Sequence, residues 1–234
     1  MKSLADQTET ELGGRWSILS RQKRDHVHLD RLLEQLQVTH GDAQDAVMNR
    51  VCRLVFPHAF AEESVLWPEL RRRLPDGEAL TLQVEQEHQE VNELVTSLED
   101  RHRGPGGHEK LIERLITVLR EDVRDEEDVL LPRLQAAVDV RRLRQLGVTW
   151  EAVRRTAPTR PHPVVSRRPP GNALAALPLT ILDRSRDAMD ATARRVPVLR
   201  SAMTTGSQGA AVLAGRVEHI GLLRRGEDAS TRRA

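Results

Sequence analysis

The first 140 residues carry apolar side chains at steps of three and four positions, which is the pattern of amphipathic helices. Four such segments are predicted, at about residues 15–37, 42–74, 77–99 and 108–138. The sequences between them, HGD, PDG and RGPGG, are short and turn-forming. Because short loops make consecutive helices antiparallel neighbours, the pattern predicts an all-α fold, an up-down-up-down antiparallel four-helix bundle over residues 15–140.

Each apolar stripe is interrupted near its middle by side chains that can bind a metal. The stripe of the first helix is expected to run inward from Trp16 through Leu29, and that of the fourth from Val118 through Val129. The candidate metal ligands that interrupt the four stripes are His26, His58, Glu62, His88, Asp122 and Glu126. Each helix therefore places ionisable groups in its own apolar face.

These groups are also expected to lie at one depth of the bundle. They stand about 13 to 17 residues from the predicted loops, and at 1.5 Å of rise per residue they converge on one level. An unpaired carboxylate in an apolar interior costs several kcal/mol, and the stripes carry no Lys or Arg at that level. A bound cation is the economical solution. Imidazole and bridging carboxylate donors from facing helices suit iron, with manganese or zinc as alternatives.

An internal repeat supports a site with two similar halves. HAFAEESVLWPEL (residues 58–70) aligns with DVRDEEDVLLPRL (122–134), and DHVHLDRLLEQL (25–36) aligns with EHQEVNELVTSL (87–98). The pairs Glu62/Glu63 and Glu126/Glu127 therefore correspond, and the second acid of each pair is expected to point about 100° away, as a solvated or outer group. The histidines outside this scheme are expected to be solvated: His28, His40, His102, His108, His162 and His219.

Four stretches together, RDHVHLDRLL, HAFAEESVLWPEL, EQEHQEVNELV and RDEEDVLLPRL, resemble the hemerythrin-like (HHE cation-binding) family over roughly residues 15–140. The resemblance implies a four-helix bundle around a non-haem di-iron centre, held by five histidines and two bridging carboxylates. It implies that His26 and His58 bind one iron and that His88 binds the other. Glu62 and Glu126 match the bridging carboxylates.

Two positions depart from the family pattern. Asn92 stands where a second histidine commonly follows His88, and Asp122 stands where a histidine opens the motif of the fourth helix. We expect Asp122 to be a replacement ligand and Asn92 to hydrogen-bond a bound water or a carboxylate. Two metals per chain, or a single metal held by His26, His58 and the two glutamates, are both compatible with this ligand set.

The two parts of the chain differ in charge and in expected order. Residues 1–140 hold 18 basic and 28 acidic residues, and residues 141–234 hold 18 and 7, so a net charge of +1 divides into −10 and +11. The expected organisation outside the bundle is a disordered N-terminus (1–14), a short helical extension (141–160), a proline-rich linker (161–171), a possible short amphipathic helix interrupted at Pro178 (172–190) and a basic tail of low order (191–234).

The leading functional interpretation is a non-haem iron protein that binds, senses or detoxifies a small oxidant such as O₂, NO or peroxide. We expect a binding protein rather than an enzyme, but a carboxylate-rich di-iron oxidase or peroxidase is an alternative. Another is an interaction protein whose arginine-rich tail binds an acidic partner, a membrane surface or nucleic acid without sequence specificity. No apolar run approaches a membrane span or a secretory signal, so a cytoplasmic location is expected.

Overall fold

The computed structural model describes residues 1–99 and 105–231, and all regular elements in these ranges are helical. The all-α prediction is therefore confirmed. The elements are α1 (Ile18–Val38), α2 (Gly41–Ala61), η1 (Glu62–Leu66), α3 (Trp67–Arg73), α4 (Gly77–Glu99), α5 (Pro105–Asp125), η2 (Glu126–Leu130), α6 (Leu131–Ala137), α7 (Val140–Arg155), α8 (Gly171–Arg195), η3 (Pro197–Leu199), α9 (Arg200–Glu218) and η4 (Gly221–Arg224).

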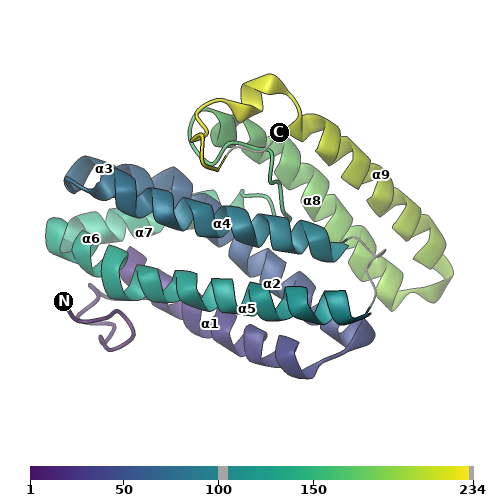
Figure 1. The fold of residues 1–234 in the computed structure, drawn as a ribbon, viewed down its shortest axis with the longest axis horizontal. Coiled ribbons are helices and arrows are strands. Elements are labelled where there is room, and N and C mark those ends of the chain that lie inside the picture. Colours follow the sequence, from purple (N-terminus) through teal and green to yellow (C-terminus); the bar gives the residue numbers. More distant parts are fainter. Residues whose placement is uncertain (100–104, 232–234) are drawn as a thin grey trace.

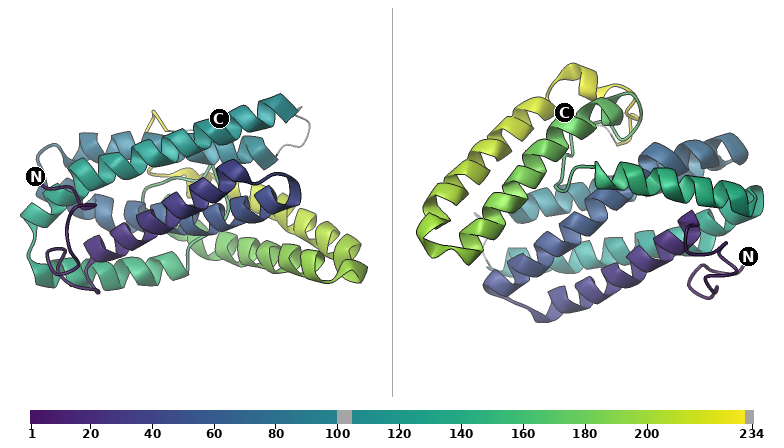
Figure 2. Two further views of the ribbon diagram at one scale, coloured as in Figure 1. Left: turned by 90° about the horizontal axis from the view of Figure 1, so that it is seen from below. Right: turned by 180° about the vertical axis from the view of Figure 1, so that it is seen from behind.

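The helices α1, α2, α4 and α5 lie side by side and form a bundle (Figures 1 and 2). Neighbouring contacts join α1 to α2, α4 to α5, and α1 to α5. The second and fourth predicted helices are each built from three consecutive elements, in which a short π-helical turn (η1 or η2) separates two α-helices. The helix α7 crosses the bundle and contacts both α1 and α2.

Two aliphatic clusters fill the bundle on either side of the level where the candidate ligands lie. One contains Leu19, Leu66 and Leu70 together with residues of α6 and α7, and the other extends from Leu29 to Leu119. The ionisable groups between them are therefore bounded by apolar side chains in both directions along the bundle axis.

The N-terminal segment differs from the disorder expected for residues 1–14. Leu4 and Leu12 are almost completely buried in the first of these clusters, and the Leu4 backbone N–H donates a hydrogen bond to the Glu127 carbonyl at 3.0 Å. Two isolated leucines in a polar segment give no periodic signal, but each fills a site on the bundle surface.

Two residues expected to face the core are exposed. Trp16 precedes Ser17, whose side chain caps α1, and it is 51% exposed under the guanidinium groups of Arg15 and Arg21. Val129 lies within η2 and is 39% exposed. The wider π turn shifts the helical phase at this point, so a periodicity of 3.6 residues assigns Val129 to the wrong face.

The C-terminal part is more ordered than the low-order tail expected for residues 191–234. The helix α8 continues through Pro178 to Arg195, beyond the helix expected at 172–190, and α9 packs along it as a hairpin (Figure 1). Ala175 and Ala214 are among the buried residues between these helices. Small residues allow the two backbones to approach closely, and this kind of packing leaves no long apolar stripe in the sequence.

His162 also differs from its expected solvated position. It is buried, with Nδ1 at 2.9 Å from Glu218 Oε1 and Nε2 at 3.0 Å from Asp183 Oδ2. Burial favours the neutral imidazole, but the two carboxylates outweigh it and raise the pKa of His162 to about 9. His28, His40 and His219 are exposed as expected, and His102 lies outside the described residues.

Within residues 1–99 and 105–231, the helices are too short or too polar to cross a membrane.

Candidate metal centre

The structure brings the six predicted ligands together. They come from six different elements of the bundle, with His26 on α1, His58 on α2, Glu62 on η1, His88 on α4, Asp122 on α5 and Glu126 on η2. Their donor atoms form two groups, each within 4.8 Å of one another. The first group is His26, His58, Glu62 and Glu126, and the second is His88, Asp122 and Glu126. Glu126 belongs to both groups.

The two π turns position the glutamates. The Trp67 N–H donates to the Glu62 carbonyl, and the Leu131 N–H donates to the Glu126 carbonyl, five residues back in each case. A proline follows each of these donors, at positions 68 and 132. Since proline has no N–H, it cannot restore the usual four-residue hydrogen bond at the next position. The repeated proline is therefore the sequence feature that accompanies each wider turn.

Each candidate histidine directs one ring nitrogen toward the centre. His26 Nε2 lies 3.2 Å from Glu126 Oε2, His58 Nε2 lies 3.0 Å from Glu62 Oε1, and His88 Nε2 lies 3.6 Å from Asp122 Oδ1. His88 Nε2 is also 3.7 Å from Glu62 Oε2. Glu62 therefore has one oxygen beside each group.

The other nitrogen of each ring lies beside a carboxylate outside the centre. His26 Nδ1 lies 2.9 Å from Glu127 Oε1, His58 Nδ1 lies 3.3 Å from Asp25 Oδ2, and His88 Nδ1 lies 2.9 Å from Glu63 Oε1. An ionised carboxylate can only accept, so Nδ1 carries the proton in each pair. This arrangement leaves Nε2 available to a metal and fixes the plane of each ring.

These three carboxylates were not identified as histidine partners from the sequence. The helical pattern predicts solvated or outer positions for Glu63 and Glu127 and assigns no role to Asp25. Each is adjacent in sequence to a candidate ligand but holds a histidine on another helix. The position of each carboxylate next to a candidate ligand could have indicated a role near the centre. Its histidine partner could not be predicted, because the two residues lie on different helices and share no helical periodicity.

Two tryptophans pack against the histidine rings. Trp150 of α7 meets His58 edge-on, with ring centroids 5.3 Å apart, and Trp67 stacks on His88 at 6.4 Å. The Arg154 guanidinium lies over Trp150 and 3.7 Å from Asp25. The helix α7 therefore closes one side of the centre and supports the carboxylate that holds His58.

The pKa values of several groups in the centre are strongly shifted. Burial favours neutral imidazoles, but Glu126 and Glu127 raise the pKa of His26 to about 9, and Asp122 and Glu63 raise the pKa of His88 to about 10. Burial and the adjacent Glu126 carboxylate raise the pKa of Asp122 well above its usual range. Burial opposes the ionisation of Glu62, but His58 outweighs it and lowers the pKa of this carboxyl, so the buried acids of the centre do not all shift in one direction.

The residues present fit a metal. Five buried atoms in the centre form no hydrogen bond of good geometry within the described part of the chain, and the first four have only an ion-pair contact of 3.0 to 3.7 Å: His26 Nε2, Glu62 Oε1, Glu62 Oε2, Asp122 Oδ1 and Glu126 Oε1. Buried polar atoms normally have a partner, and all five belong to the two donor groups. Cations between these atoms would satisfy all of them.

The hydrogen bonds of Asn92 in the structure are with backbone groups. Its Nδ2 donates to the His88 carbonyl at 2.9 Å, and its Oδ1 accepts from the His162 backbone N–H at 3.0 Å. Both ends of the amide are therefore used by backbone groups, and none of these contacts involves a carboxylate.

A small cavity lies beside the donor groups. Its volume is about 20 Å³, which is space for about one water-sized molecule. Its lining combines candidate donors with apolar side chains, among them His26, His58, His88, Asp122, Leu29, Leu54, Phe56, Val91 and Leu119. The polar part of the lining therefore combines four candidate ligands with Asp25 and Asn92.

Comparison with known proteins agrees with the geometry. The description Hemerythrin HHE cation binding domain matches residues 17–134, which is half of the chain. An uncharacterized hemerythrin-like protein of Schizosaccharomyces pombe is 23% identical over 134 residues, which cover 57% of this chain and 66% of the yeast protein, just under two thirds. Comparison with solved structures gives no match. The match over half of the chain confirms the resemblance found in the sequence, and the chain belongs to the hemerythrin HHE cation-binding domain family.

Proposed function

We propose that this protein binds two iron ions in an asymmetric centre inside an up-down-up-down four-helix bundle. His26, His58, Glu62 and Glu126 would hold one ion, and His88, Asp122 and the shared Glu126 would hold the other. The five buried donor atoms without hydrogen bonds of good geometry carry this proposal. The position of Glu126 in both donor groups favours two ions over one.

Iron is the proposed metal because imidazole nitrogens combined with bridging carboxylates suit iron, with manganese and zinc as weaker candidates. The two halves are not equivalent. The His88 group has three donors where the His26 group has four, and Asp122 brings a further negative charge. We therefore expect the His88 half to bind its ion less tightly and to favour the ferric state.

The proposed ligand is a small oxidant such as O₂, NO or peroxide. The cavity of about 20 Å³ has room for a molecule of this size, and apolar side chains make up much of its wall. Bound iron supplies the redox chemistry, while the chain orients the imidazoles. The same small volume leaves no space for an organic substrate, which supports binding or sensing over an oxidase reaction. A cytoplasmic location is part of this proposal.

Anaerobic loading with Fe²⁺, followed by measurement of iron per chain, tests the centre. We expect a ratio near two, and new charge-transfer absorption after addition of azide or peroxide. The variant His26→Ala should lower the ratio. His28→Ala is the matched control, because His28 lies two residues away on the same helix and is exposed. A ratio near one would contradict the dinuclear centre, and a chain without bound iron would contradict the proposed function.

A further inference from the structure

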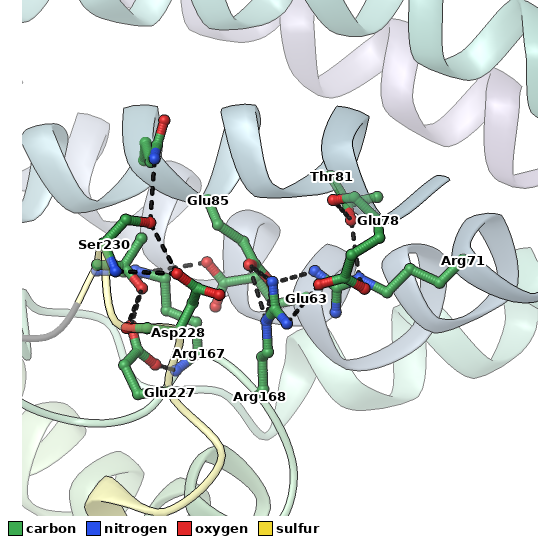
Figure 3. Close-up of polar contacts among 12 residues, drawn as sticks. Glu63, Arg71, Glu78, Thr81, Glu85, Arg167, Arg168, Glu227, Asp228 and Ser230 are labelled. Carbon is green, nitrogen blue, oxygen red and sulfur yellow. Dashed lines mark hydrogen bonds and ion pairs between the residues drawn. The ribbon is translucent and has the colours of Figure 1, made fainter. Parts of the chain in front are cut away.

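The segment between α7 and α8 docks on the bundle through two adjacent arginines, Arg167 and Arg168. In Figure 3 both side chains extend to acidic residues of the bundle. The two residues follow each other in the chain, but they reach different acids. Because of this difference, substitutions of the two arginines can distinguish the docking of the segment from an effect on the metal centre.

Arg168 makes contacts that serve docking. Its guanidinium lies 2.6 Å from Glu85 Oε2 and 2.6 Å from Glu78 Oε1. Glu85 is buried and also pairs with Arg71 at 2.6 Å. Neither Glu78 nor Glu85 is one of the carboxylates that hold a candidate ligand.

Arg167 instead reaches the support of the centre itself. The residue is only 7% exposed, and its Nη1 lies 3.3 Å from Glu63 Oε1. The same oxygen is 2.9 Å from His88 Nδ1. The second guanidinium nitrogen donates to Gln89, next to His88 in the chain. A continuous series of contacts therefore runs from the C-terminal part of the chain to a candidate ligand.

A second contact joins the same segment to the same part of α4. The His162 backbone N–H donates to Asn92, whose amide donates to the His88 carbonyl. Between the segment and the bundle lies a cavity of about 50 Å³, and its lining shares Phe56, Ala59 and Asn92 with the cavity beside the donors. The segment thus covers the His88 side of the centre.

We propose that Arg167 is a positioning residue of the metal centre, which holds the Glu63 carboxylate on His88 and offsets its negative charge. A carboxylate on Nδ1 makes an imidazole a stronger donor to its metal, and a cation beside that carboxylate weakens this effect. Through Arg167, the C-terminal segment lessens the preference of the His88 half for Fe³⁺. This inference rests on the proposed iron centre.

The test compares the reduction potentials of the iron-loaded, full-length protein and three variants. Arg167→Gln removes the cation and should shift the potential to a lower value, whereas Arg167→Lys should stay near the wild type. Arg168→Gln is the matched control, because it removes the docking contacts to Glu78 and Glu85 but leaves Glu63 untouched. An unchanged potential in Arg167→Gln, or an equal shift in Arg168→Gln, would overturn the proposal.

A double substitution tests whether Arg167 acts through Glu63. Glu63→Gln weakens the acceptor on His88 and should raise the potential. In that background, Arg167→Gln should produce a much smaller shift than it does alone, because the contact through which it acts has been removed. Equal shifts in both backgrounds would contradict a role through Glu63.

A measurement without metal separates this inference from the proposed function. In the metal-free protein, the ¹⁵N resonance of His88 Nδ1 should move in Arg167→Gln and stay in place in Arg168→Gln. If wild-type protein binds no iron, the proposed function fails while this comparison still reports on Arg167. If iron binds but the His88 resonance is the same in all three proteins, the inference about Arg167 alone fails.

Discussion

At the scale of single residues, the three candidate histidines share one construction. Each ring has a carboxylate beside Nδ1, and its Nε2 belongs to or faces one of the two groups of candidate metal-binding atoms. The protons and the metal ions therefore compete for the same side of each ring. This competition leads to one prediction, and the buried carboxylate of Asp122 leads to a second.

The first concerns pH. Because the pKa values of metal-free His26 and His88 are about 9 and about 10, both imidazoles are charged at neutral pH, and a metal must displace their protons. The affinity for Zn²⁺, used as a redox-inert probe, should increase as the pH rises from about 6 to about 9. Calorimetric titration in two buffers with different heats of ionisation measures the protons released.

The same pKa values determine the stability of the metal-free protein. A histidine whose pKa is raised in the folded state stabilises the fold fully below its unfolded value, about 6.5. This contribution is lost as the pH rises through about 9 and about 10. The melting temperature of the metal-free protein should fall across this range. In the calorimetric titration, Zn²⁺ binding without proton release at neutral pH would show that the imidazoles are not charged.

The second residue-scale prediction concerns Asp122. The variant Asp122→Asn removes a buried carboxylate next to Glu126, so the metal-free protein should gain on the order of 1 kcal/mol of stability, or about 2 to 4 °C in melting temperature. The same variant should bind one iron in place of two. Glu121→Gln, at the exposed neighbouring position, is the control and should change neither value. A variant that keeps two irons would remove Asp122 from the ligand set.

At the scale of elements, α7 is the part that joins the family domain to the C-terminal helices. It contacts α1 and α2, carries Trp150 against His58, and approaches the start of α1 at Gly147. A methyl group on Gly147 would overlap the Trp16 carbonyl and come within 2.8 Å of the Ile18 nitrogen. The position of α7 on α1 therefore depends on a residue without a side chain.

Gly147→Ala should lower the free energy of unfolding by about 1 to 3 kcal/mol, because backbone atoms must move to admit the methyl group. Since Trp150 would move with α7, Zn²⁺ affinity should fall as well. Gly215→Ala on α9 is the matched control, because a methyl group there meets open space, and it should raise stability by up to about 1 kcal/mol. Equilibrium denaturation measures both, and equal effects would contradict the close packing of α7.

The elements also show which features the sequence could predict. The periodic stripes predicted the four bundle segments, and their interruptions predicted the six donors that the structure brings together. The pairing of Glu63 with His88 and Arg167 could not be predicted, because contacts across 25 and 104 positions leave no period in the chain. Val129 was placed on the wrong face because the π turn changes the period itself.

At the scale of the whole molecule, the acidic bundle and the basic C-terminal part attract each other. Arg168 pairs with Glu78 and Glu85 of the bundle. Arg160 has its closer partners, Asp187 and Asp190, on α8, and it also lies 3.6 Å from Glu99 of the bundle. The helical hairpin of α8 and α9 is therefore fixed to the bundle on one side, and its far end lies away from the bundle (Figure 1).

Limited digestion with trypsin tests this arrangement. Within residues 156–231, the first cuts should follow Arg194, Arg195 or Arg200, which are exposed near the junction of α8 and α9. Arg167 is buried, and cleavage after it should be much slower because it requires local opening. A synthetic peptide of residues 156–205, cut at all these sites at similar rates, is the control. Equally fast cleavage after Arg167 in the intact protein would contradict the docked arrangement.

The exchange of carboxylates between the two repeated helix pairs has a consequence for assembly. Glu127 of the second pair holds His26 of the first, and Glu63 of the first pair holds His88 of the second. A single pair, separated from its counterpart, has an imidazole that lacks its acceptor and an acid that lacks its donor. The two repeats are therefore reciprocal, and fragments split at the loop near residue 76 must recombine before His26 or His88 can be held by its carboxylate, whereas His58 keeps Asp25 within its own fragment.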